Sequence, residues 1–242
     1  GMSRLGWLCD EGHRTEAADA IAAVCALPGL EVEGIYTHFA NADGDEAYTM
    51  GQFTRFLELL SELEGRGITF PIRHCAASAA VLKYPCTHLD MVRPGVALYG
   101  HYPDPSCEGL DGVGLRPVMA LKTRVASVKA VPAGTPVSYG CTHVLERDAE
   151  LAALTVGYAD GLPRLCSDRL EVLIRGQRAP IVGRVCMDMC MADATGLGAA
   201  PGDEVELFGE HLPVEDTAAL AGTIQYELLC AVSPRVPREY LN

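Results

Sequence analysis

Two successive patterns predict an α/β domain followed by a mostly β domain. Segments of strand and helix character alternate over the first hundred residues, which is typical of βα units on a parallel sheet. The stretch over 102–117 is rich in proline and glycine, and short strand-like runs dominate beyond it. We therefore predict a partial TIM-type (βα) barrel over 1–102 and a β domain over 117–242, joined by a linker over 103–116.

The first half of the predicted α/β domain contains two helices and a strand. Residues 15–27 predict a helix with one apolar face, which Pro28 and Gly29 end. Residues 31–37 read as a strand. The run over 46–67 predicts a second helix, because its phenylalanines and leucines recur at helical spacing.

The rest of this domain continues the alternation. A strand is predicted over 71–75, a short helix over 78–83, and a strand over 89–99 that Pro94 and Gly95 interrupt. These elements make about half of the eight βα units of a closed barrel. A half barrel leaves an open parallel edge, so we expect a second copy or a missing front part to cover it.

The second domain is predicted from its strand-like runs, which glycine, proline and aspartate turns separate. A short helix over 214–222 should precede a last strand carrying IQYELLC. The expected strands lie in the runs over 120–131, 151–158, 170–176, 179–194 and 203–209.

Composition narrows the class of protein. The net charge of −13 disfavours a nucleic-acid or anionic-membrane partner, since phosphate binding needs clustered Lys and Arg. The 10 cysteines lie in apolar segments without a CxxC pair, which favours reduced thiols in the cytoplasm over disulfides. No apolar run reaches the roughly 18 residues of a membrane span. Gly1 before Met2 is typical of tag removal, so we expect the reading frame to begin at Met2.

Several polar residues stand at positions where a barrel carries its chemistry. His38 follows a predicted strand, although a histidine there could equally satisfy backbone groups. Ser78 stands at a strand-to-helix turn, where it could hold a phosphate or simply cap the helix. Arg93 interrupts an apolar strand, and Gly95 would allow close approach of a ligand; an exposed arginine on an edge strand is the alternative.

Three tyrosines each follow or end a predicted strand. They are Tyr139 in PVSYG, Tyr158 in VGYADG and Tyr226 in IQYELLC. Tyrosine in a strand usually packs, so none is diagnostic alone.

Together these motifs resemble the alanine racemase family, in the family's order and over almost the whole chain. The matching segments are GMSRLG, THFA, HCAASAA, VRPGVALYG, PVSYG, VGYADG, GRVCMD and the terminal YEL and RVPR. The resemblance implies pyridoxal 5'-phosphate (PLP) in the mouth of a TIM barrel, closed by the β domain of a partner subunit. It also implies an isomerase that supplies D-alanine for cell wall biosynthesis.

The resemblance assigns most cofactor contacts to the first domain. Arg93 would donate to the pyridine nitrogen of PLP, which makes the ring a weaker electron sink. His38 would lie by the ring and link Arg93 to the catalytic tyrosine. Ser78, the N–H groups of Gly95 and Val96, and Tyr226 from the second domain would bind the phosphate.

The resemblance also assigns the groups that handle substrate. Tyr139, from the partner subunit, would be the acid–base group on one face of the substrate α-carbon. Arg4 would act near the substrate carboxylate, Met187 would offer its N–H to that carboxylate with Asp188 supporting the turn, and Tyr158 would line the entrance. Arg235 and Arg238 would be structural or belong to the outer entrance. No metal is expected.

Three departures from the family pattern qualify these expectations. The sequence has no K-A-x-A-Y-G motif, which carries the PLP lysine and the second acid–base group. Ala77 stands where the family usually has Asn, which would remove one hydrogen bond near the PLP, worth ~1 kcal/mol. The family's carbamylated lysine falls outside these residues.

Two classes of function follow. The first is an alanine racemase, inactive as the isolated chain for want of that lysine and dimeric in its complete form. Tyr226 favours alanine, since serine-preferring relatives carry a smaller residue there, although serine or another amino acid is the alternative. The second is a non-catalytic remnant that serves as a dimerising module. A related PLP decarboxylase is disfavoured, because neither a Gly-Gly-Gly phosphate loop nor a Cys-Asp pair occurs.

Overall fold

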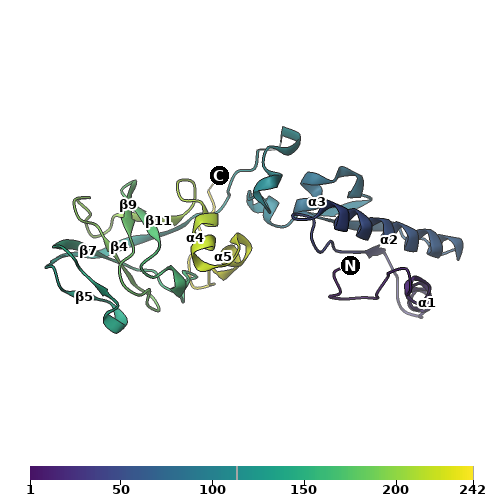
Figure 1. Cartoon of the computed structure of the whole chain (residues 1–242), viewed down its shortest axis with the longest axis horizontal. Coiled ribbons are helices and arrows are strands. Elements are labelled where there is room, and N and C mark those ends of the chain that lie inside the picture. The colour runs from purple at the N-terminus through teal and green to yellow at the C-terminus, as the bar shows by residue number, and fades with distance from the viewer. Residues whose placement is uncertain (113, 242) are drawn as a thin grey trace. The chain divides into compact units, whose positions relative to one another are not determined.

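The computed structural model of the chain describes residues 1–112 and 114–241 (Figure 1). Val113, in the predicted linker, and Asn242, in the predicted β domain, lie outside the described residues. Contacts divide the chain into two compact units, Gly1–Arg116 and Pro117–Asn242, which we call unit 1 and unit 2.

Unit 1 is built on a parallel sheet in the order β1-β2-β3. The strands are β1 (Gly34–Tyr36), β2 (Ile72–Ala77) and β3 (Met91–Arg93). Helix α2 (Glu46–Gly65) connects β1 to β2, and α3 (Ser78–Lys83) connects β2 to β3. These alternating units are part of a (βα) barrel, which confirms the predicted fold of this part of the chain.

Apolar helix faces hold unit 1 together. Helix α1 (Arg14–Cys25) packs against α2 through a cluster that includes Ile21, Leu63 and Phe70. The Asp45 side chain accepts a hydrogen bond from the Tyr48 N–H at 2.9 Å and so caps the first turn of α2.

The strand predicted over 89–99 is wrong in its length. Only β3 is a strand, and Val96–Tyr99 form a 3-10 helix after Pro94 and Gly95. Proline lacks the N–H that a sheet ladder needs, so the strand ends at Arg93. Further 3-10 helices lie at Pro85–Thr87, Pro105–Cys107 and Leu110–Gly112.

Unit 2 is a six-stranded antiparallel sheet in the order β10-β7-β4-β11-β8-β9. Ile181, just after β9, bridges to Ala192 in β10, so the sheet is nearly closed. Its strands are β4 (Leu121–Val131), β7 (Ala149–Leu154), β8 (Glu171–Ile174), β9 (Gln177–Pro180), β10 (Cys190–Asp193) and β11 (Glu204–Phe208). The predicted mostly β second domain is confirmed.

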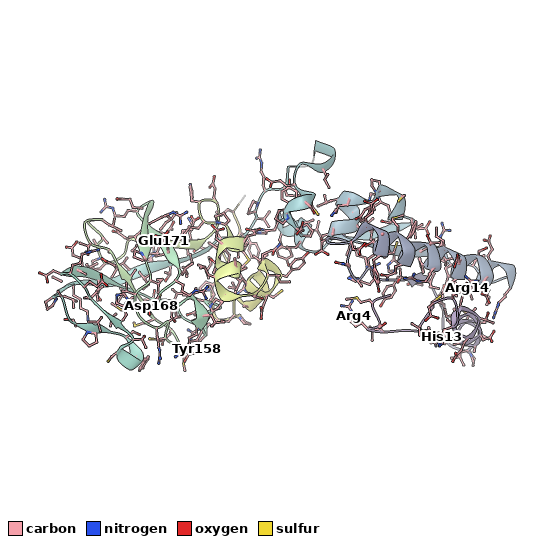
Figure 2. All side chains as sticks on the ribbon, viewed as in Figure 1. Arg4, His13, Arg14, Tyr158, Asp168 and Glu171 are labelled. Atoms are coloured by element: carbon pink, nitrogen blue, oxygen red, sulfur yellow. The ribbon has the colours of Figure 1, made fainter. Side chains whose placement is uncertain are left out.

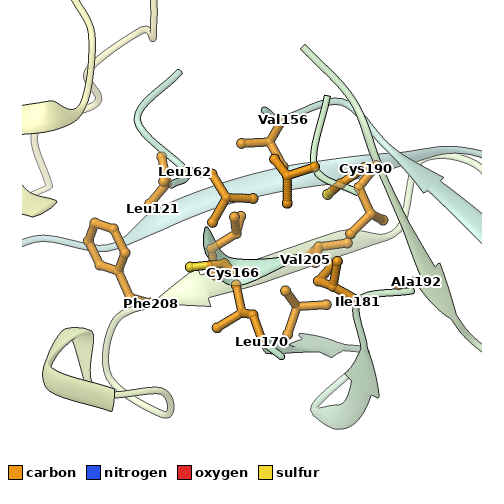
Figure 3. Close-up of a cluster of buried hydrophobic side chains, with 14 of the residues drawn as sticks. Leu121, Val156, Leu162, Cys166, Leu170, Ile181, Cys190, Ala192, Val205 and Phe208 are labelled. Carbon is orange, nitrogen blue, oxygen red and sulfur yellow. The ribbon is translucent and has the colours of Figure 1, made fainter. Parts of the chain in front are cut away.

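A contiguous apolar core fills the unit 2 sheet (Figure 3). Val172, Ile174 and Val205 are fully buried within it. Helices α4 (Val214–Ala221) and α5 (Gln225–Ala231) contribute Val214 and Leu228 to the same cluster. A small separate hairpin of β5 (Pro136–Val137) and β6 (His143–Val144), with a 3-10 turn at Tyr139–Cys141, completes the unit, and Arg164–Cys166 form another 3-10 turn.

Two predictions for unit 2 need correction. The segment IQYELLC lies in helix α5, after its N-cap Ile224, and not in a last strand; Gln225 and Leu228, three residues apart, are both buried, which is helical spacing. The run over 179–194 holds the end of β9 and all of β10, separated by an irregular segment around Gly183. None of the helices within the described ranges combines the length and apolarity needed to cross a membrane.

Candidate functional site

Arg93 ends β3 in unit 1 and is surrounded by neutral acceptors. Its Nη2 donates to the carbonyl oxygens of Thr37 and Cys75, at 3.1 and 3.3 Å, and to Nδ1 of His38 at 3.3 Å. Its Nη1 donates to Nδ1 of His74. No carboxylate of the described residues pairs with Arg93, and its Nε–H donates to none of their atoms. The half-buried cation therefore keeps donor capacity and an unbalanced charge for a ligand.

The two histidines beside Arg93 are held in one tautomer. A guanidinium only donates, so each imidazole accepts at Nδ1 and carries its proton on Nε2 when neutral. Burial lowers the pKa of His38, and the charges of Arg93 and Arg4 lower it further. Burial and Arg93 likewise lower the pKa of His74. Both rings therefore favour the neutral form near pH 7.

An aromatic stack supports the same guanidinium. The Tyr36 and His74 rings are stacked, with centroids 5.1 Å apart and an interplanar angle of 8°. The Arg93 guanidinium carbon lies 5.1 Å from the Tyr36 ring centroid, within the range of a cation–π contact. Parallel pairing explains the arrangement, because Tyr36 of β1 lies opposite His74 of β2.

Ser78 begins α3 and binds the turn after β3. Its Oγ accepts hydrogen bonds from the N–H groups of Gly95 at 2.8 Å and Ala97 at 3.3 Å. Ala77, and not Ser78, is the helix N-cap, so the alternative of a capping serine is wrong. Two accepted bonds leave the Ser78 hydroxyl proton to donate. The Val96 N–H, at the start of its 3-10 helix, has no acceptor among the described residues.

Arg4, labelled in Figure 2, lies in the N-terminal segment. It lines a cavity in unit 1. The cavity has a volume of about 610 Å³, and His38 and Tyr36 also line it. The Arg4 charge contributes to the lowered pKa of His38, so the two side chains are electrostatic neighbours.

In unit 2, Tyr158 and Met187 lie on two backbone segments that are joined by main-chain hydrogen bonds. The N–H of Tyr158 donates to the Cys186 carbonyl at 3.0 Å, and the N–H of Ala159 donates to the Met187 carbonyl at 2.9 Å. A Cβ atom on Gly157 would stand 2.3 Å from the Cys186 oxygen, so only glycine allows this approach. We call residues 183–189 the Met187 turn. Its Met187 N–H has no acceptor among the described residues.

Tyr139 lies at the tip of the β5–β6 hairpin, residues 136–144, which we call the Tyr139 hairpin. Its side chain is 72% exposed. Ser138, Gly140 and Cys141 all have positive φ, at 62°, 76° and 50°. The two non-glycine residues, Ser138 and Cys141, are strained, and such strain beside an exposed side chain is common at functional sites.

The predicted residues thus form two groups, one in each unit. His38, Ser78, Arg93, Gly95 and Val96 lie at the ends of the three parallel strands of unit 1, with Arg4 on the adjoining cavity. Tyr158 and Met187 lie together in unit 2, where Tyr226 stands in the first turn of α5. Asp160 accepts from Gly157 N–H and from Arg235 Nε at 2.7 Å, which gives Arg235 a structural contact.

Sequence reasoning missed His74 and Tyr36. His74 lies in the HCAASAA motif, four residues before Ser78, and Tyr36 lies two residues before His38. In each case the neighbouring residue was predicted as the functional one. Alternation along parallel strands would have put Tyr36, His74 and the strand-ending Arg93 on one face. Among residues 1–112 and 114–241, no three His, Cys, Asp or Glu side chains gather to hold a metal ion.

Comparison with known proteins covers both units. A family model described as "Alanine racemase, N-terminal domain" matches residues 1–103, and "Alanine racemase, C-terminal domain" matches residues 118–240. Curated alanine racemases of Desulforamulus reducens and Desulfovibrio desulfuricans are 51% and 48% identical over the whole chain. The chain spans 65% and 64% of their lengths.

Solved structures give the same result. The alanine racemase of Streptomyces lavendulae has a TM-score of 0.90 at 38% identity, covering 100% of this chain and 64% of that protein. The enzyme of Bacillus anthracis, solved with bound L-Ala-P, has a TM-score of 0.92 at 36% identity, covering 100% and 62%.

Proposed function

The chain belongs to the alanine racemase family, and from this premise we propose that it carries the PLP- and substrate-binding part of an enzyme that interconverts L- and D-alanine. The observation that carries the proposal is the Arg93 guanidinium, which lies among neutral acceptors at the end of β3, just before the turn whose Gly95 N–H donates to Ser78 Oγ. The family is PLP-dependent. Its reaction supplies D-alanine, a cell wall precursor.

The donor set of unit 1 fits PLP. Arg93 offers a cationic donor of the kind that binds a pyridine nitrogen, without itself giving up a proton. The Ser78 hydroxyl proton and the Val96 N–H are directed at no other acceptor of the described residues, and they suit phosphate oxygens. Gly95 N–H is engaged by Ser78 Oγ at 2.8 Å, so it would contribute only by exchanging that acceptor for the phosphate. Tyr226 is assigned to the same phosphate.

When bound, PLP supplies an electron-withdrawing ring that acidifies the α-proton of an amino acid. The residues of this chain then orient the substrate and move that proton. Tyr139 is the group proposed to take or return it on one face. A free tyrosine has a pKa of about 10, so it needs a nearby cation or hydrogen-bond donor to act as a base near neutrality. His38 Nε2–H, polarised by Arg93 through Nδ1, is the proposed source of that help.

The substrate carboxylate is assigned to Met187 N–H and Arg4. Both offer donors without a partner carboxylate in the described residues, and the Met187 turn is fixed by its bonds with the Tyr158 segment. Tyr158, 46% exposed, is proposed to line the entrance. The preference for alanine rests on Tyr226, and other amino acids remain substrates to be compared.

The proposal includes a homodimer, since Tyr139 acts across a subunit interface in this family. It also needs the PLP lysine, whose K-A-x-A-Y-G motif does not occur in these 242 residues. We propose the cytoplasm as the location, supported by the ten cysteines, none of which forms a disulfide in the described structure. A non-catalytic dimerising module is the second proposal, motivated by the absent lysine motif.

Complementation distinguishes the two proposals. The N-terminal segment of the Desulforamulus reducens relative that precedes the matched region would be co-expressed with this chain, or fused to it. The first proposal expects a PLP-containing complex that converts L-alanine to D-alanine, and loss of conversion in Tyr139→Phe. A folded, PLP-containing complex without turnover would overturn it in favour of the non-catalytic module.

A further inference from the structure

We infer that the turn formed by Ser167 and Asp168 is a positioning element that fixes the Tyr139 hairpin and the Met187 turn relative to each other. The inference deepens the proposed function and rests on it, because both partners carry residues assigned there. All the contacts involved lie within unit 2, and Figure 2 marks Asp168 on that unit.

Tyr139 needs such an element because its own side chain anchors nothing. The ring is mostly exposed, and its hydroxyl has no hydrogen-bond partner among the described residues. Its place is therefore set by the backbone of the hairpin. That backbone is a two-residue ladder with positive φ at Ser138 and Cys141, and a short strained hairpin has little stability of its own.

Asp168 contacts both elements with one oxygen. Its Oδ1 accepts the Gly183 N–H at 2.5 Å, at the start of the Met187 turn. The same oxygen lies 2.8 Å from Nδ1 of His143, on the second strand of the Tyr139 hairpin, as an ion pair when the imidazole is protonated. Asp168 itself has a φ of 56°, so the backbone is held in a left-handed conformation to present this side chain.

Two serines complete the connection along consecutive residues of the Met187 turn. Ser138, beside Tyr139, donates from its hydroxyl to the Arg184 carbonyl at 2.7 Å. Ser167 Oγ accepts the Val185 N–H at 2.9 Å and donates to the Arg164 carbonyl at 2.5 Å. Three consecutive residues of the Met187 turn are thus each bound by a side chain. Asp168 binds Gly183, Ser138 of the hairpin binds Arg184, and Ser167 binds Val185.

The Tyr139 hairpin and the Met187 turn are also closely packed against each other at Gly183. A Cβ atom on Gly183 would stand 2.8 Å from the Ser138 side chain and from the Val137 carbonyl oxygen, and Gly183 has a φ of 74°. Val137 and Val182, the residues next to Ser138 and Gly183 in the sequence, belong to one small buried cluster. Movement of the hairpin should therefore require the Asp168 and Ser138 contacts to break.

The different contacts of Asp168 and His143 give a specific test. Asp168→Gly removes the contacts to Gly183 and His143, and glycine adopts the left-handed φ of this position without strain. His143→Ala removes only the contact to the hairpin. Asp168→Asn keeps an acceptor and also tolerates the φ. Glu171→Gln is the matched control, since it weakens the exposed Glu171–Arg178 pair of the same unit without contact to either element.

Amide hydrogen exchange on the whole chain reads out the result, together with ¹⁹F NMR of 3-fluorotyrosine assigned through Tyr139→Phe. We expect exchange in residues 138–142 to rise about tenfold in Asp168→Gly and His143→Ala. Exchange in residues 183–189 should rise only in Asp168→Gly. Asp168→Asn should restore both segments to within about twofold of wild type, and Glu171→Gln should match wild type. The Tyr139 fluorine resonance should shift in the first two variants only.

Unchanged exchange and an unchanged fluorine resonance in folded His143→Ala would overturn the inference, as would equal effects of Asp168→Asn and Asp168→Gly. If Asp168→Gly does not fold, His143→Ala and Asp168→Asn still decide between these outcomes. None of these measurements needs catalysis. Failure of the proposed function would leave the exchange pattern intact, and failure of the positioning role would leave alanine turnover in the complemented protein.

Discussion

Nη2 of Arg93 lies 3.3 Å from Nδ1 of His38; Arg93 ends β3, and His38 follows the end of β1 in the same parallel sheet. Because the guanidinium donates, the imidazole must carry its neutral-form proton on Nε2. Arg93 thus fixes the tautomer of His38, and its charge adds to burial in lowering the pKa of that ring. The same guanidinium holds His74 and lies on the Tyr36 ring, so one cation organises three aromatic side chains.

Replacing Arg93 with Gln should weaken PLP binding. A hydrogen bond from a charged donor contributes roughly 1.5–3 kcal/mol, which corresponds to an affinity loss of about 10–100-fold. Titration of PLP followed by absorbance and tyrosine or tryptophan fluorescence measures this. Arg73→Gln is the control, because Arg73 pairs with Asp90 at the surface. Equal affinities for the two variants would show that Arg93 does not contact the cofactor.

The pKa of His38 should lie below 6.5, the usual value, because burial and two guanidinium charges oppose its protonation. The unfolded chain then binds more protons than the folded chain, so this group adds stability above about pH 6.5 that is lost as the pH falls. NMR titration of His38 tests the direction. In Arg93→Gln the pKa should rise, and an unchanged value would contradict the electrostatic coupling.

Ser78→Ala should destabilise unit 1. The serine is 3% exposed and accepts from two backbone N–H groups, which would lose their acceptor. The expected fall in unfolding free energy is about 1–3 kcal/mol. Denaturant unfolding measures it, and Ser61→Ala, at an exposed position of α2, should change little. PLP affinity should fall as well, since the hydroxyl proton is the proposed phosphate donor.

Gly157→Ala should displace the Met187 turn. The new methyl group would overlap the Cys186 carbonyl oxygen and the Met187 carbonyl, at 2.3 and 2.5 Å, and backbone must move to relieve it. We expect destabilisation of about 1–3 kcal/mol by thermal or denaturant unfolding. Gly65→Ala, at the end of α2 with no atom within 4 Å, is the control for the substitution itself. A variant as stable as wild type would contradict the tight approach described for this turn.

The spacing of apolar residues, and the glycines and prolines that end each segment, predicted much of the fold. The helices near 14–25, 46–65 and 78–83 follow from apolar spacing and from glycine or proline at their ends. Near Tyr226, the strand prediction failed because a segment of seven residues can be strand or helix by its sequence alone, and only the burial of Gln225 and Leu228, at helical spacing, decides between them. Arg93 was found because a cation in an apolar strand is unusual. Asp168, His143 and His74 escaped prediction, since their roles arise from contacts between segments distant in the sequence.

The most direct test of the account is exchange of the alanine α-proton in deuterated water, followed by NMR. Wild type and Tyr139→Phe would each be complemented with the lysine-bearing segment and loaded with PLP, and L- and D-alanine would be tested separately. If Tyr139 serves one face, Tyr139→Phe abolishes exchange of one enantiomer and spares the other. Equal exchange of both enantiomers in wild type and Tyr139→Phe would contradict the assignment of Tyr139 as an acid–base group of this protein.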